Sequence, residues 1–103
     1  MYVCEAGGLR AAAQVFALAA ALDIPCIIGS QAELGIGTAA AVHLGVAVPN
    51  LPYACETFGP LRYHRDVVRN TPRISSGFLY PPDGPGLGVE LDEEFVRELS
   101  ANL

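Results

Sequence analysis

The sequence predicts an α/β fold with parallel strands, and three observations lead to this class. Short apolar runs of strand length alternate with two stretches in which apolar residues recur every three or four positions, the period of a helix. The runs are apolar throughout, as expected of strands that are buried on both faces of a parallel sheet. Their centres lie about 25 residues apart, close to the length of one βα unit in an eight-stranded barrel.

The first strand and helix are predicted near the start of the chain. Residues 2–5 are expected to form the end of a strand, which Gly7 and Gly8 terminate. A helix is predicted over residues 9–22 and ends at Asp23. Its apolar face consists of Leu9, Ala12, Val15, Phe16, Ala19 and Leu22.

Two further strands and a second helix complete a β-α-β-α-β order. Residues 24–29 and 51–56 are expected to be strands, joined by right-handed crossovers. Gly37 and Thr38 mark the start of the intervening helix, and Pro49 stops it. One side of that helix consists of Ala39, Val42, His43 and Val46.

The alternation ends after Gly59 and Pro60, which divides the chain into residues 1–61 and 62–103. The second part is expected to contain a short helix (61–69), an extended segment (73–80), turns rich in proline and glycine (81–88) and a helix that runs from Asp92 through Leu99. Asp92 is a predicted N-cap, because acidic side chains stabilise the start of a helix.

The composition excludes several classes of function. Eleven acidic and six basic residues give a net charge of -5, so nucleic acid is not an expected partner. All six basic residues are arginine, which rules out Schiff-base chemistry and a lysine general base within this sequence. No segment has the length of a membrane span, and the apolar stretch near the N-terminus lacks the positive flank of a signal peptide.

The cysteines and the high apolar content indicate where the chain works and what covers it. Cys4, Cys26 and Cys55 are widely spaced in apolar surroundings, so we expect buried free thiols in a reducing cytoplasm. A hydrophobic content of 51% exceeds what a small self-sufficient domain needs. Three parallel strands cannot close a barrel, so we expect homo-oligomers or association through open sheet edges.

Four motifs in order resemble the muconate lactonizing branch of the enolase superfamily, which includes the mandelate racemase type. Each follows a predicted strand or forms the tail, and together they span nearly the whole chain: Gly7-Gly8-Leu9, residues 29–37, residues 56–61 and residues 85–92. The resemblance implies the C-terminal part of a (β/α)7β TIM-like barrel. Residues 2–5, 24–29 and 51–56 would be its sixth, seventh and eighth strands, and the tail would pack on a capping domain that this sequence lacks.

The resemblance also implies a reaction, namely abstraction of a proton α to the carboxylate of a small substrate, with Mg²⁺ holding the enolate. The family's metal ligands lie on the third to fifth strands, so no metal ligand can be assigned here. Tyr2 stands where the branch has a catalytic lysine. A phenol can donate a proton but is a poor base at neutral pH, so Tyr2 is either a general acid or a residue that shapes the pocket.

The predicted site residues follow the strands. Glu56 matches the acidic residue at the end of the eighth strand and is a candidate catalytic group, with an ion pair to Arg62 as the structural alternative. Ser30 and Glu33, in the loop after the seventh strand, are candidate substrate-binding residues on the same face. Residues 35–40 fit a dinucleotide fingerprint by letter, but five residues separate them from the strand, so we expect tight packing rather than a dinucleotide.

Three hypotheses follow for the chain as a whole. It is part of a cycloisomerase, racemase or epimerase, or dehydratase, and is inactive in isolation. Alternatively, it is an interaction fragment that self-associates or completes a barrel with another chain. A third reading is a small binding module that uses the helix start at Gly37.

Overall fold

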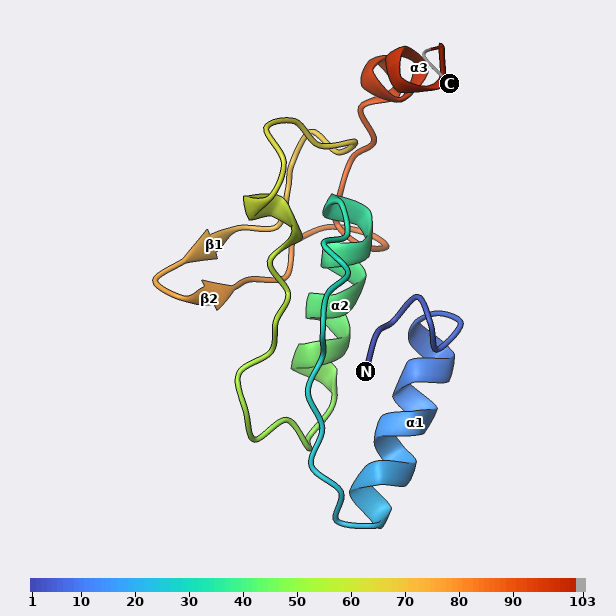
Figure 1. The fold of residues 1–103 in the computed structure, drawn as a ribbon, viewed down its shortest axis with the longest axis vertical. Coiled ribbons are helices and arrows are strands. Elements are labelled where there is room, and N and C mark those ends of the chain that lie inside the picture. Colours follow the sequence, from blue (N-terminus) through green and yellow to red (C-terminus); the bar gives the residue numbers. More distant parts are fainter. Residues whose placement is uncertain (102–103) are drawn as a thin grey trace.

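The computed structural model describes residues 1–101, and in them three α-helices, one 3-10 turn and one hairpin. In chain order the elements are α1 (Leu9–Ala21), α2 (Gly35–Ala47), η1 (Gly59–Leu61), β1 (Ile74–Ser75), β2 (Phe78–Leu79) and α3 (Glu93–Ala101). α2 lies between α1 and the hairpin, and α3 projects from one end (Figure 1). The radius of gyration is 14.4 Å. A compact chain of this length would have about 13 Å, so the molecule is open.

Helix α1 agrees with its predicted bounds because both of its ends are encoded locally. Gly7 and Gly8 have φ of 86° and 107°, values that L side chains rarely adopt, so the glycines are needed for the turn into the helix. At the other end Asp23 has φ 54° and is the left-handed residue of a Schellman motif. The N–H of Ile24 bonds to the carbonyl of Ala19, which completes that motif.

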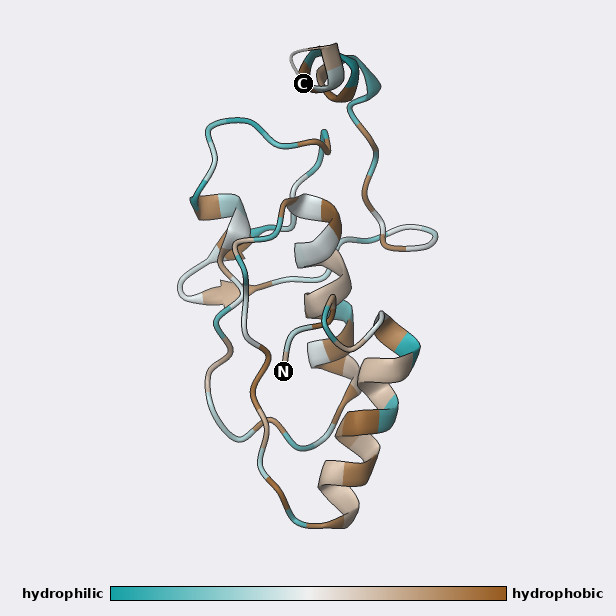
Figure 2. Ribbon diagram, turned by 45° about the vertical axis from the view of Figure 1, so that its right-hand side comes forward, coloured by the Kyte–Doolittle hydropathy of each residue, from teal (hydrophilic) through white to brown (hydrophobic). Residues whose placement is uncertain are grey.

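The apolar face of α1 is only partly buried. Ala12, Phe16 and Ala19 pack inward, as predicted. Val15 and Leu22 were expected on the same face but are 45% and 61% exposed. Brown and tan cover most of this helix (Figure 2), because apolar residues occur all around it while only one side has a neighbour.

The first predicted strand, residues 2–5, is wrong, because the pairing lies one residue earlier, at Met1. Only Met1 bonds as in a parallel pair: its amino group donates to the Ile27 carbonyl at 3.0 Å, and its own carbonyl accepts from Gly29 N at 2.9 Å. The chain then coils, with Ala6 N bonded to the Tyr2 carbonyl. The glycine-rich turn that follows therefore begins inside the residues expected to be strand.

The other two predicted strands lie side by side without forming a regular ladder. Cys26 N bonds to the Asn50 carbonyl, and Glu56 N bonds to the Ile28 carbonyl. Between these bonds, Ile28 N donates to the Cys55 sulfur at 3.3 Å instead of to a carbonyl. Pro52 has no N–H to contribute. Within residues 1–101 the only sheet is consequently the hairpin, in place of a three-stranded parallel sheet.

The core is small and lies between α1, α2 and the central extended segment. Its buried members are Ala12, Phe16, Ile28, Ala41 and Leu44. The prediction of buried thiols is wrong for Cys4 and Cys55, which are exposed, while Cys26 is partly buried. All three are free, and the exposure follows from the lack of a covering element over these segments in the described part of the chain.

The predicted helix over residues 61–69 is absent. Only η1 is helical there, and beyond it the chain runs irregularly to a single bridge between Val68 and Leu91. The segment 73–80 is extended, as expected, but it folds back as the hairpin β1–β2 through Ser76 and Gly77, both with positive φ.

Side chains from the irregular segment hold the tail. Asn70 donates to the Gly88 carbonyl and accepts from Glu90 N. Arg65 lies over the Phe95 ring at 4.0 Å and pairs with Asp92 and Glu98, which fixes α3. Asp92 accepts from Phe95 N, confirming the predicted cap. No helix formed by residues 1–101 has both the length and the apolar character that crossing a membrane requires.

Candidate functional site

Three predicted site residues, Tyr2, Ser30 and Glu56, lie near one another at the ends of the extended segments. The bond from Gly29 N to the Met1 carbonyl places Tyr2 beside Gly29 and Ser30. The bond from Glu56 N to the Ile28 carbonyl places Glu56 on the other side of the same segment. Tyr2, Ser30 and Glu56 therefore lie at one edge, as the ends of adjacent parallel segments must.

The ring of Tyr2 packs against a glycine. A Cβ added to Gly29 would stand 2.8 Å from Cε1 of Tyr2, which is closer than real Cβ contacts allow. Gly29 is buried and is thus the residue that lets the ring approach the backbone. The ring of Tyr2 is therefore held by packing against the backbone, and its role as a general acid or as a wall of the pocket stays a prediction.

Ser30 and Glu33 form a hydrogen-bonded pair. Ser30 Oγ donates to Glu33 Oε2 at 2.5 Å and accepts from Ala32 N at 3.0 Å. Partial burial alone would raise the pKa of Glu33, but the hydroxyl of Ser30 and the backbone N–H groups of Gln31 and Glu33 outweigh it and lower the pKa below its usual value of 4.5. Glu33 is therefore an ionised acceptor at neutral pH.

The loop after the second segment is also tied to the first turn. Gln31 Nε2 donates to Glu5 Oε1, and its Oε1 accepts weakly from Cys4 Sγ at 3.7 Å. The amide of Gln31 thus bridges two loops that are 26 residues apart in sequence. Neither Gln31 nor Glu5 was predicted, since an exposed amide in a loop gives no signal of its own.

The N-terminus of α2 already holds an anion from within the chain. Both carboxylate oxygens of Asp66 accept from Gly35 N, at 2.9 and 2.8 Å. The helix begins at Gly35, two residues before the predicted start, because this distant carboxylate caps it. A binding module built on that helix start is disfavoured, since the capping position is filled.

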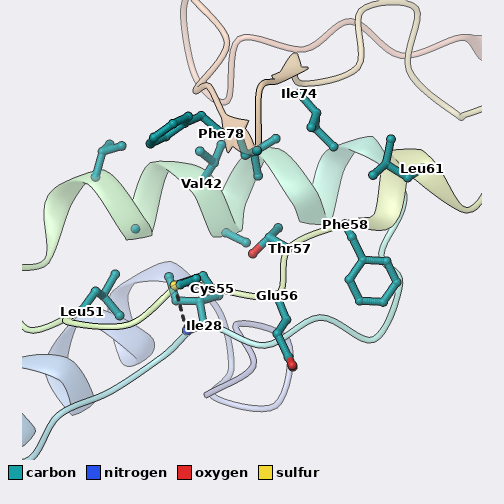
Figure 3. Close-up of a pocket in the computed structure, with 16 residues that line it drawn as sticks. Ile28, Val42, Leu51, Cys55, Glu56, Thr57, Phe58, Leu61, Ile74 and Phe78 are labelled. Carbon is teal, nitrogen blue, oxygen red and sulfur yellow. Dashed lines mark hydrogen bonds between the residues drawn. The ribbon is translucent and has the colours of Figure 1, made fainter.

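Glu56 stands apart from the apolar surroundings of its segment. In Figure 3 its side chain points away from α2, whereas the sulfur of the preceding Cys55 is bonded to Ile28 N in the neighbouring extended segment. Among residues 1–101 it makes no ion pair with an arginine. Arg62 instead lies over the ring of Phe58 at 5.8 Å, so the structural alternative for Glu56 is wrong.

An apolar groove of about 480 Å³ runs between α2, residues 51–58 and the hairpin (Figure 3). Ile28, Val42, Leu51, Ile74 and Phe78 are among the side chains that line it. Residues 54–58 form one wall of the groove, and Glu56 belongs to that wall although its carboxylate points away from α2. The groove therefore borders the cluster of Tyr2, Ser30 and Glu56, with Glu56 common to both.

The two histidines do not belong to this cluster. His43 Nε2 lies 3.2 Å from the Leu87 carbonyl and so helps hold the tail, and His64 is exposed. No three His, Cys, Asp or Glu side chains gather to hold a metal in the part of the chain that the structure describes. These residues by themselves do not fit the Mg²⁺ that the resemblance to the enolase superfamily implies.

A family model and curated relatives both place the chain in the enolase C-terminal domain-like family. The family model "Enolase C-terminal domain-like" matches residues 1–95. The chain is 37% identical to muconate cycloisomerase 1 of Rhodococcus opacus over 95% of this chain and 26% of that protein. It is 41% identical to muconate cycloisomerase 1-1 of Acinetobacter lwoffii over 93% of this chain and 25% of that protein. The chain thus spans about a quarter of the length of these relatives.

Solved structures of the mandelate racemase and muconate lactonizing type are also similar to this chain. A muconate lactonizing enzyme from Klebsiella pneumoniae superposes with a TM-score of 0.88 at 33% identity, covering 94% of this chain and 27% of that one. A mandelate racemase/muconate lactonizing family protein from Azoarcus sp. EbN1 gives 0.84 at 38% identity, covering 91% of this chain and 28% of that one.

Proposed function

Since the chain belongs to the enolase C-terminal domain-like family, we propose that it forms one side of the active site of a muconate cycloisomerase-like enzyme. The observation that carries this proposal is the meeting of Tyr2, Ser30 and Glu56 at one edge, fixed by backbone bonds at Gly29 and Glu56. The substrate class is a small carboxylate, and the reaction is cycloisomerisation, racemisation or epimerisation, or dehydration, in a cytoplasmic enzyme.

Each residue has a proposed role. Glu56 exchanges a proton with the substrate or orients it, because it is the free carboxylate of the cluster. Ser30 and Glu33 bind a polar group of the substrate. Tyr2 shapes the pocket wall against Gly29, with proton donation by its phenol as the second possible role. Mg²⁺, when bound in a complete enzyme, would stabilise the enolate, and its ligands would come from outside this chain.

A second candidate function is assembly, and the exposure of large apolar side chains favours it. Leu18, Leu22, Leu61 and Phe78 are 61% to 71% exposed. Such a surface fits a piece that covers itself by self-association or completes a barrel with another chain. Sedimentation at micromolar concentration separates the candidates, because a monomer that binds no other barrel segment would contradict the assembly function.

The enzymatic proposal is tested by restoring the rest of the barrel. In a chimaera, this chain replaces the matching quarter of the Rhodococcus opacus relative, and α-proton exchange of candidate carboxylic acids into deuterated water is followed with Mg²⁺. We expect exchange by the chimaera, a loss of about 100-fold or more with Glu56→Gln, and no exchange by the isolated chain. Glu94→Gln, in the exposed first turn of α3, is the matched control.

Two results would contradict the proposal. Turnover by the isolated chain with Mg²⁺ would show that the chain is complete in itself. A folded chimaera with equal exchange rates before and after Glu56→Gln would remove Glu56 from the chemistry.

A further inference from the structure

The loop that carries Ser30 and Glu33 is shaped by side chains instead of by regular backbone pairing. Ala32 has φ 60°, a left-handed conformation that costs free energy in any residue other than glycine. Something must therefore hold it. The Ala32 carbonyl accepts from the hydroxyl of Tyr63 at 2.9 Å, and the Glu33 carbonyl accepts from Thr38 Oγ1 at 3.0 Å.

Thr38 is the central member of this arrangement. Thr38 is fully buried, and among residues 1–101 it is the one polar residue that is buried. A buried hydroxyl is costly unless it is hydrogen-bonded, and the carbonyl of Glu33 is its partner. A valine of the same shape would fill the space without that requirement, so packing alone does not explain a threonine here.

Two glycines let the loop close on Thr38. A Cβ at Gly59 would stand 1.7 Å from the Glu33 carbonyl oxygen and 2.9 Å from Thr38 Oγ1. A Cβ at Gly37 would stand 2.7 Å from the Cβ of Glu33. The backbone and the side-chain stem of Glu33 are thus enclosed on two sides, which leaves the carboxylate directed to Ser30.

We propose that Thr38 and Tyr63 are positioning residues that fix the Ser30–Glu33 loop and so hold the Glu33 carboxylate in place for substrate. Thr38 acts from the first turns of α2, and Tyr63 acts from the segment after η1. The loop after the second extended segment is therefore set by two residues that follow it in sequence, at separations of 5 and 31 positions. This inference rests on the proposed function only in taking Glu33 as substrate-facing.

The test is made on the whole chain by NMR and needs no substrate. Thr38→Val keeps the shape and removes the hydroxyl. We expect the pKa of the Glu33 carboxyl, followed by its ¹³C shift, to rise toward its usual value, and the amide of Ala32 to exchange roughly fivefold faster. Thr38→Ser, which keeps the hydroxyl, is expected to retain the parent values of both. Thr71→Val, at an exposed position, is the matched control.

Tyr63→Phe provides the second route, since Tyr63 is 47% exposed and its hydroxyl can be removed without disturbing the core. For Tyr63→Phe we again expect a rise in the pKa of Glu33 and faster exchange of the Ala32 amide. Tyr53→Phe is the control, because Tyr53 is 64% exposed. If either variant folds and leaves the Glu33 pKa and the Ala32 exchange rate unchanged, the positioning role is wrong. Glu33→Gln in the chimaera tests the substrate role separately, so failure there leaves the NMR result standing.

Discussion

The carboxylate of Glu33 is held by hydrogen bonds that all arise within its own loop. Ser30 Oγ is the side-chain donor, and the N–H groups of Gln31 and Glu33 add to it. Desolvation acts in the opposite direction, so the lowered pKa is a balance that one donor can change. Glu56, by contrast, is exposed and points away from α2 without a described ionic partner, which suits a group that must meet a substrate.

At this scale we predict that Ser30→Ala raises the pKa of Glu33. Because the folded-state pKa is lowered from 4.5, the ionised carboxylate stabilises the fold above that value. The contribution is lost as the pH falls through the folded-state pKa. Ser30→Ala is therefore expected to reduce the free energy of unfolding more at pH 7 than near pH 2.5, as measured by urea denaturation at the two pH values.

The control is the same substitution in a Glu33→Gln background. There the pH-dependent part of the loss should vanish, leaving only the effect of the lost Ala32 N–H bond. Equal losses at both pH values in the parent background would contradict the link between Ser30 and the charge of Glu33.

At the scale of elements, the sequence predicts a helix reliably where the residues that end the helix lie within a few positions of it. The helices α1 and α3 were predicted well because Gly8, Asp23 and Asp92 specify their ends locally. The strands failed because pairing depends on neighbours, and here a cysteine sulfur and a proline interrupt the ladder. The helix over 61–69 failed because that segment is bound by tertiary contacts of Asp66 and Val68.

The residues of the candidate site also fall into two groups, those that the local sequence identifies and those whose partners are distant in sequence. Ser30 and Glu33 are neighbours in one motif and could be predicted. Thr38 marks the helix start in the sequence, but its bond to the Glu33 carbonyl is visible only in the folded chain. Tyr63 and Asp66 bond to residues 31 positions away. Nothing in their local sequence reveals such partners, so only the folded chain identifies them.

Two glycines of α2 give a matched test of how its start is clamped. A Cβ at Gly35 would meet Val68 Cγ2 at 2.2 Å, whereas one at Gly45 would meet Ile28 Cδ1 at an ordinary 3.5 Å. We expect Gly35→Ala to destabilise the chain by about 1–3 kcal/mol through overpacking. Gly45→Ala should stabilise it by about 0.5–1 kcal/mol, because alanine favours a helix interior.

Urea denaturation of both variants against the parent measures these changes. Equal stability of the Gly35→Ala and Gly45→Ala variants would contradict the clamp of Asp66 and Val68 on the helix start.

At the scale of the whole molecule, the chain has two faces without partners in the described residues. One is the outer side of α1, and the other is the groove between α2 and the hairpin. The open shape, with extents of 47 × 30 × 25 Å, leaves both accessible. In a complete barrel such faces would contact neighbouring units, which connects the apolar composition to the proposed role as one part of a larger enzyme.

We therefore predict that the isolated chain self-associates at tens of micromolar and that the outer face of α1 contributes to it. Leu18 and Leu22 lie one turn apart there, 62% and 61% exposed. Burying the pair in an interface is worth about 3 kcal/mol or more, so Leu18→Glu with Leu22→Glu should weaken association about 100-fold in sedimentation velocity. Ser100→Glu with Ala101→Glu adds the same charge to α3 and should have little effect. If the charged α1 variant associates as the parent does while Phe78→Glu is monomeric, the contact lies in the groove, and the prediction for α1 is wrong.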